Sequence, residues 1–313
     1  MIGFIARRLL ATIPVLGMVA LFVFMMLRLT PGDPAAIMAG DNATAAQILE
    51  IRERLGLTQP LYTQFAIWFG NLLQGNLGES FFFKMPVHTL ILQRVGPTLS
   101  LAVTTLIITI LVAVPLGVIA AYRHGTLVDR IVMGFSVLGF SVPVFVLGYI
   151  LIWFFAIELG WFPVQGYKPP EAGLLIFLHH LILPSVTLSV IYIALIARIT
   201  RASVLEVLGE DFIRTARAKG LRDSVVLMRH ALRNAAVPIV TVIGIGIALL
   251  IGGVVVTESV FNIPGLGRLT VDAVLGRDYP TIQGVILVFS GVYVLINLLI
   301  DIAYTIFDPR IRY

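Results

Sequence analysis

The sequence of 313 residues contains no cysteine, and only 12% of its residues are charged. Without thiols there are no disulfides and no thiolate metal sites. Lysine is scarce as well, because only Lys84, Lys168 and Lys219 occur. None of the three lies in the G-x-x-x-x-G-K-[ST] pattern that cradles nucleotide phosphates. The sequence therefore contains no nucleotide-binding motif of this kind.

Patterns of catalytic and metal-binding residues are also missing. No Ser/His/Asp or paired-carboxylate arrangement stands out. His179 and His180 are adjacent, so on a helix they point in different directions, unlike the i, i+4 histidine pair of a metal site. The sequence predicts a chain that is not an enzyme and has no metal site and no cofactor of its own.

Apolar residues dominate the chain. Hydrophobic residues make up 58% of it, and the mean hydropathy is +0.99. A spanning helix needs about 20 apolar residues. Because backbone amides in hydrocarbon must be satisfied within their own segment, we predict an all-α polytopic membrane protein with six transmembrane helices. The charge-free windows that hold them are 9–27, 95–122, 131–157, 172–197, 234–257 and 279–300.

Lysine and arginine are unevenly divided between the two sides of the predicted membrane. With the N-terminus inside, 14 of the 22 fall on the inner side: Arg7, Arg8, Arg123, Arg130, Arg198, Arg201, Arg214, Arg217, Lys219, Arg222, Arg229, Arg233, Arg310 and Arg312. The positive-inside rule then predicts that both termini are cytoplasmic. The net charge of +5 reflects this topology, and nucleic-acid binding is a poor explanation for it.

The chain divides into a first transmembrane helix (1–29), an extracytoplasmic helical region (30–96), a transmembrane domain of five helices (97–306) and a tail (307–313). The outer region is too long to be a mere connection. Two short amphipathic helices are predicted in it, which cover the outer ends of the bundle or also receive a soluble partner. They carry Ile48, Ile51 and Leu55 before Gly56, and Leu61, Phe65, Trp68 and Leu72 before Gly75.

Small residues and prolines characterise the spanning windows. Gly244, Ala248 and Gly252 fall four apart and allow another helix to approach closely. Three prolines permit kinks: Pro115, Pro143 and Pro184.

The last window carries a polar face, because Tyr293, Asn297, Asp301 and Tyr304 share one side of a helix. An acid in a membrane segment is a functional candidate. Arg310 and Arg312 follow closely, so an ion pair at the membrane interface is the simpler interpretation. Tyr293, Asn297 and Asp301 are kept as candidates for a translocation path.

The most distinctive segment is the basic loop from Gly209 to Pro238, which overlaps the inner loop 201–236 and ends where the fifth spanning helix is predicted to open. Phe212, Ile213 and Ala216 form an apolar stripe on a first predicted helix, which Gly220 ends. A second helix, capped by Asp223 or Ser224, is predicted to place Val225, Met228, Leu232 and Ala235 on one face and Arg229 and Arg233 on a ridge.

Such a helix–glycine–helix unit is stiff on both sides of one bend and can transmit a push. Its arginines could lie on anionic lipid. In the inner loop 201–236, the mixture of apolar positions with arginines and four acids (Glu206, Glu210, Asp211 and Asp223) favours a groove in a protein partner instead.

At this loop the chain resembles the integral-membrane subunits of ABC importers that work with a soluble binding protein. Arg214-Thr215-Ala216-Arg217-Ala218-Lys219-Gly220 looks like their cytoplasmic coupling motif. The resemblance extends over essentially the whole chain, and its outer region is similar to that of the first permease in dipeptide, oligopeptide, glutathione and nickel importers. Further matching segments are Pro31–Pro34, Leu55–Leu61, Gly75–Ser80, Phe261–Gly267 and Asp308–Arg312.

The resemblance implies a type I ABC importer permease fold in a bacterial inner membrane. It implies a second homologous permease as heterodimer partner, two cytoplasmic ABC ATPase subunits that bind ATP and Mg, and an extracytoplasmic substrate-binding protein. Peptides are the expected cargo, and glutathione or a nickel chelate is the alternative within the family. From another class, an ion-gradient-driven transporter would use Asp301 as its coupling carboxylate. The expected ATPase-coupling residues are Arg214, Thr215, Ala216, Arg217, Gly220, Arg229, His230, Arg233 and Asn234.

Overall fold

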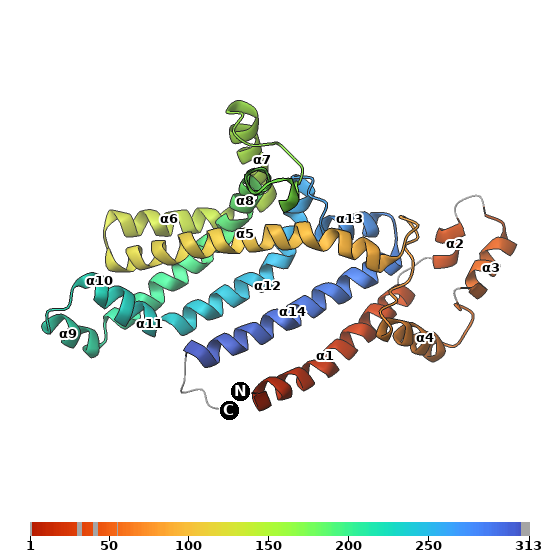
Figure 1. Cartoon of the computed structure of the whole chain (residues 1–313), viewed down its shortest axis with the longest axis horizontal. Helices are drawn as coiled ribbons and strands as arrows, with labels where there is room; N and C mark the ends of the chain where they lie inside the picture. Colours follow the sequence, from red (N-terminus) through yellow and green to blue (C-terminus); the bar gives the residue numbers. More distant parts are fainter. Residues whose placement is uncertain (1, 30–32, 40–42, 55, 308–313) are drawn as a thin grey trace. The chain divides into compact units, whose positions relative to one another are not determined.

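The computed structural model describes residues 2–29, 33–39, 43–54 and 56–307. Over these ranges the chain forms helices joined by turns, and the single extended pairing is an isolated bridge between Glu79 and Pro86. The chain divides into two compact units, one of residues 1–96 and 268–295 and the other of residues 97–267 and 296–313. Figure 1 traces the helices in chain order. The predicted tail 307–313 lies outside the described residues from 308 onward, as do Pro31, Gly32 and Leu55 of the family-like segments.

Four of the six predicted windows are covered by helices long and apolar enough to cross a membrane. They are α5 (Val87–Tyr122), α8 (Leu174–Leu208), α12 (Ala236–Val260) and α14 (Tyr279–Phe307). The first window lies in α1 (Ile2–Leu29), whose apolar stretch Leu10–Met26 is shorter. The all-α class is confirmed.

The window 131–157 differs from its prediction because it is not one continuous helix. It holds α6 (Leu127–Ser141), α7 (Val144–Leu151) and the π-helical η1 (Ile152–Glu158), and the axis turns by 105° between Ser141 and Val144. Val142 is extended, with φ −92° and ψ 122°. A residue before proline is pushed away from the helical region, and Pro143 itself lacks an N–H, so the predicted kink becomes a break.

The first unit contains the predicted outer helices. α3 (Ala45–Arg54) and α4 (Leu61–Leu73) are followed by Gly56 and Gly75, which have φ of +67° and +77°. Phe65 and Trp68 of α4 lie 5.2 and 5.6 Å from the ring of Phe24 in α1. The two amphipathic helices are confirmed, and α2 (Pro34–Ala39) precedes them.

A buried carboxylate holds together the end of this unit. Asp278 is fully buried and follows α13 (Leu266–Leu275). It accepts hydrogen bonds from the Ser80 hydroxyl at 2.5 Å, the Phe81 amide at 3.0 Å and the Thr281 hydroxyl at 2.7 Å. Three donors satisfy the group, so the turn at residues 79–86 is fixed to the start of α14.

The second unit is built around α8, which packs on α6, α7 and α12. Close approach along α12 occurs at Gly244, where an added methyl group would lie 2.5 Å from Ile300. Gly252 does not take part, because a methyl group there would meet no described atom within 4 Å. α8 comes close one residue later, at Gly253, through Leu188 and Tyr192. Within this chain, the predicted close approach is confirmed at Gly244, and at Gly252 it stays a prediction.

The tightest contact between α5 and α8 gives a stability prediction. A methyl group on Gly117 would lie 2.6 Å from Cβ of Thr200 and 2.7 Å from the carbonyl oxygen of Ala197. Because a backbone carbonyl cannot move aside as a side chain can, Gly117→Ala is expected to lower the free energy of unfolding by about 1–3 kcal/mol. The measurement is the thermal unfolding midpoint of the purified complex in detergent.

Gly134→Ala is the matched control, since Gly134 is also inside a helix and a methyl group there meets no described atom within 4 Å. It is expected to leave the midpoint unchanged or raise it slightly. Equal midpoints for the two variants would show that α5 and α8 are not packed this tightly.

Candidate functional site

The predicted helix–glycine–helix order of the basic loop is confirmed. α9 (Asp211–Ala218) follows α8, and the second helical stretch consists of α10 (Asp223–Val225), the π-helical η3 (Val226–Ala231) and α11 (Leu232–Asn234). These elements lie between the end of α8 and the start of α12, as Figure 1 shows.

Gly220 ends α9 in a Schellman motif. Its own amide bonds to the carbonyl of Arg217 at 2.9 Å, and the amide of Leu221 bonds to the carbonyl of Ala216 at 3.3 Å. Gly220 has φ of +78°, the left-handed conformation that this motif requires and that glycine adopts without cost. No described atom lies within 4 Å of the position of a Cβ at Gly220, so the requirement is one of backbone conformation and not of space.

One side of α9 is buried in the chain itself. Ile213 is fully buried and Ala216 is 6% exposed, while Phe212 is 43% exposed. The two buried residues belong to a cluster that joins α9 to the adjoining ends of the long helices: Val118 and Ala121 of α5, Val204 of α8, and Ala235 and Ile239 close to the start of α12. Ala216, which was expected to be a coupling residue, therefore packs α9 against the long helices. Of the predicted apolar stripe, Ile213 and Ala216 are buried and Phe212 is exposed.

The buried face of the second stretch differs from its prediction. Met228, expected inside, is 61% exposed, and the buried residues are Val226, Ala231 and Ala235. The reason is the π-helical turn, in which the amide of Leu232 bonds to the carbonyl of Leu227, five residues earlier. A wider turn moves the inward position from i+4 to i+5, which a search at a period of 3.6 residues misses.

The outward side of the loop is basic. The side chain of Arg214 is 77% exposed and that of Arg217 is 47% exposed, and Arg229 and Arg233 are exposed on the second stretch. Thr215 is exposed and donates to the carbonyl of Asp211 at 3.0 Å. The amide of Asn234 donates to the carbonyl of His230 at 2.6 Å. Apart from Ala216, which is buried, and His230, which is partly buried, the expected coupling residues are therefore exposed.

Asp223 connects the two helical stretches. Its carboxylate is 3.7 Å from Nε of Arg217 and accepts a hydrogen bond from the hydroxyl of Tyr122 at 3.2 Å. Tyr122 is the last residue of α5. The three groups are largely exposed, and an exposed ion pair contributes little to stability. They link Arg217, in the last turn of α9, to the first residue of α10 and to the end of α5.

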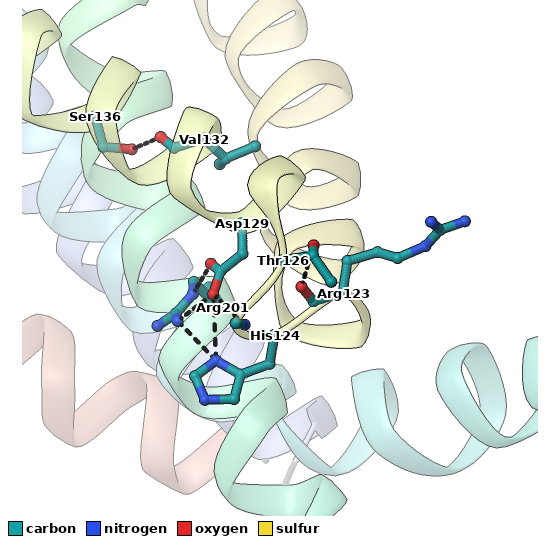
Figure 2. A network of polar contacts seen from close by, with 8 residues as sticks. Arg123, His124, Thr126, Asp129, Val132, Ser136 and Arg201 are labelled. Carbon is teal, nitrogen blue, oxygen red and sulfur yellow. Dashed lines mark hydrogen bonds and ion pairs between the residues drawn. The ribbon is translucent and has the colours of Figure 1, made fainter.

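A second polar group, absent from the predicted site, lies beside the loop and is shown in Figure 2. Asp129, in the first turn of α6, is 4% exposed. It receives Nε and Nη2 of Arg201 at 2.5 and 2.8 Å, and the amide of Gly125 at 3.0 Å. Nδ1 of His124 is 3.2 Å from Asp129 and 3.0 Å from Nη2 of Arg201. We call this group, His124, Asp129 and Arg201, the clasp.

In the clasp, Arg201 makes a bidentate contact with the buried carboxylate of Asp129. Bidentate arginine–carboxylate pairs are among the strongest hydrogen-bonded ion pairs in proteins. The clasp joins the turn between α5 and α6 to α8, about two helical turns before α8 ends at Leu208. Asp129 and Arg201 are 72 positions apart in the sequence, and no periodicity relates them. The available signal was weak: Asp129 is a lone acid on the predicted inner side between two apolar windows.

The candidates for a translocation path lie in α14. Tyr293 is 48% exposed, and Asn297 and Asp301 are partly buried. Each of the three takes part in an interaction within the chain, so Asp301 is not a free carboxylate. Tyr304 lies in the same helix. Their contact with a transported molecule remains a prediction.

The adjacent histidines are occupied by backbone carbonyls. A ring nitrogen of His179 lies 2.7 Å from the carbonyl oxygen of Trp161, and one of His180 lies 2.8 Å from that of Ile176.

A buried carboxylate lies at the far end of α12. Glu258 is fully buried and accepts a hydrogen bond from the Thr98 hydroxyl at 2.6 Å, and the Thr98 oxygen accepts one from the Leu266 amide at 2.8 Å. This carboxylate fastens the loop after α12 and was not foreseen either.

Comparison with known protein families gives two matches. The family described as "Binding-protein-dependent transport system inner membrane component" matches residues 113–313. The corresponding N-terminal family, "Binding-prot-dependent transport system membrane comp, N-term", matches residues 1–102.

Similar proteins cover the whole length. A probable peptide ABC transporter permease protein of Sinorhizobium fredii is 58% identical over 310 residues, 99% of each chain. A glutathione transport system permease protein of Escherichia coli O6:H1 is 45% identical over 313 residues, 100% of each chain. Among solved structures, an inward-facing form of the MetNI methionine ABC transporter matches with a TM-score of 0.59 at 19% identity, over 71% of this chain and 97% of that one. At this identity the structural match shows the fold alone.

Proposed function

The chain belongs to the family of binding-protein-dependent transport system inner membrane components and is a permease of the ABC importer class, and from that premise we propose that it carries peptides across a bacterial inner membrane. In this proposal it pairs with a second, homologous permease. It hydrolyses nothing itself and holds no cofactor, because two cytoplasmic ATPase subunits bind ATP and Mg. A soluble binding protein delivers the cargo on the outer side.

The observation that carries the proposal is the two-sided construction of α9. Ile213 and Ala216 are buried in the chain's own core, whereas Arg214, Thr215 and Arg217 face outward. A helix seated firmly on the ends of three long helices, with a basic outer face, can receive a force from a protein groove and pass it to those helices. The excess of lysine and arginine on the same side supports a cytoplasmic location for this loop and for both termini.

The domain division proposed with this function is a first transmembrane helix (1–29), the outer region 30–96, the transmembrane domain 97–306 with loop 201–236, and the tail 307–313. Peptide cargo is supported by the similarity to the probable peptide ABC transporter permease of Sinorhizobium fredii. The relative from Escherichia coli keeps glutathione as the alternative cargo.

The test is uptake of labelled di- and tripeptides into vesicles that contain this chain with its sister permease, ATPases and binding protein, with and without ATP. We expect saturable uptake that needs ATP. If peptides fail while the binding protein still stimulates ATP hydrolysis, glutathione and nickel chelates are the next cargoes to measure. Uptake that needs no ATP and collapses with the proton gradient would instead support an ion-driven transporter with Asp301 as its carboxylate.

A further inference from the structure

α6 and the second half of α8 are fastened to each other at three points. At one end the clasp joins Asp129 to Arg201. Farther along α6, the guanidinium of Arg198 lies 5.6 Å from the ring centre of Phe140. Next to Phe140 on α6, a methyl group on Gly139 would lie 3.1 Å from Cβ of Ala194, about one turn before Arg198 on α8, so the two backbones are in close contact there. Two helices joined both by close packing and by a buried ion pair cannot slide past each other unless these contacts are broken.

The fastened part of α8 leads directly into the loop. Pro184 lies before it, and no proline interrupts α8 from Val190 to Leu208. Gly209 follows, and α9 begins at Asp211. α8 is continuous from Arg201 to Leu208, and two residues, Gly209 and Glu210, separate it from α9, so a displacement of α9 has to cross this short turn before it reaches Arg201 along the helix. α6 has a defined end as well, because the chain leaves the helix at Val142 and Pro143 and turns by 105°.

We infer that the clasp makes α6 and the second half of α8 a single lever, driven by the coupling loop and ending at the Val142–Pro143 break. Asp129, Arg201 and His124 are positioning residues in this inference, since none of them is placed on the surface that meets the ATPase. The inference rests on the proposed function, because it assumes that the loop is pushed. It adds a second route by which a displacement of the coupling loop is transmitted to the membrane helices, from Arg201 through Asp129 to α6 and the turn that precedes it.

Arg201→Lys is the first test. Lysine keeps the charge but cannot make the two-pronged contact with Asp129. In the reconstituted complex we expect uptake per ATP hydrolysed to fall about tenfold while ATP hydrolysis itself changes by less than about twofold. Arg130→Lys is the matched control, because Arg130 is an exposed arginine of α6, next to Asp129, and its replacement is expected to leave the ratio unchanged.

The second test leaves the clasp intact and uses the absence of cysteine from this chain. Gly139→Cys with Ala194→Cys places two thiols where α6 and α8 touch, and a disulfide requires the helices to separate by only about half an ångström. In a complex whose other subunits also lack cysteine, we expect oxidation to leave uptake per ATP unchanged. Oxidation should also restore the ratio in the Arg201→Lys background. Addition of a reductant to the same sample is the control.

Three outcomes would overturn the inference: arrest of uptake by the disulfide, an unchanged ratio in Arg201→Lys, or an equal fall of uptake and ATP hydrolysis in that variant. The first would mean that α6 and α8 must separate during transport, and the last that the clasp only stabilises the fold. A failure of the proposed function is distinguishable, because the unsubstituted complex would then show no ATP-driven uptake at all.

Discussion

Replacement of Gly220 by proline is expected to abolish ATP-driven uptake while the chain still inserts in the membrane. Proline fixes φ near −65°, whereas Gly220 needs φ of +78°. It also removes the amide that bonds to the carbonyl of Arg217. The Schellman motif is lost, and the angle between α9 and the second helical stretch is no longer defined. Uptake in vesicles and co-purification of the ATPase subunits measure the effect.

Two controls separate the conformation at Gly220 from a general defect. Gly220→Asn is expected to retain most of the uptake, because asparagine tolerates the left-handed region that costs other residues about 1–2 kcal/mol. Gly75→Pro breaks a turn of the same kind, with φ of +77°, at the end of α4. It is expected to leave the ATPase subunits bound. Normal uptake by Gly220→Pro would remove the coupling role from this loop.

Reversal of two charges, Arg229→Glu with Arg233→Glu, is expected to prevent stable association of the ATPase subunits and so to abolish uptake. Both arginines are exposed, so the change alters the surface and not the core. In a complementary interface, opposed like charges cost several kcal/mol. The measurement is the amount of ATPase co-purified with this chain at low and high salt, since added salt should weaken the repulsion.

Arg123→Glu with Arg130→Glu is the matched control for that reversal. It changes the net charge by the same amount at two exposed positions, Arg123 directly after α5 and Arg130 in the first turns of α6. ATPase association is expected to persist. An equal loss of co-purified ATPase in both double variants would show that the net charge of the chain decides the association, and that Arg229 and Arg233 have no specific role in it.

Hydropathy predicted where the helices lie but not where one of them breaks. The window 131–157 is apolar throughout, and composition cannot register that Val142 is extended before Pro143. The same proline in the sequence is compatible with a mild kink or a complete break, and the neighbouring packing decides between them. Pro115 and Pro184, by contrast, lie inside the continuous helices α5 and α8.

The position of the coupling loop in the sequence was predicted more accurately than which side chains of its helices are buried. Its glycine turn follows from local chemistry, which the sequence displays directly, and Gly220 adopts it. The face of the second stretch depends on a change of helical period at Val226–Ala231, and the exposed Met228 shows the error that results. The clasp depends on tertiary contacts between residues far apart in the chain. Periodicity and short motifs in the sequence do not reveal such contacts.

The π-helical turn has one further consequence, which concerns how densely the loop displays side chains. Val226 and Ala231 are the anchors that hold this turn to the bundle, and four residues stand between them, including the exposed Met228 and Arg229. A regular turn, with anchors three or four positions apart, would leave two or three in the same place. The turn therefore places one more residue between its two buried contacts than a regular helical turn would. In the proposed coupling role, that residue is an additional contact group for the ATPase subunit.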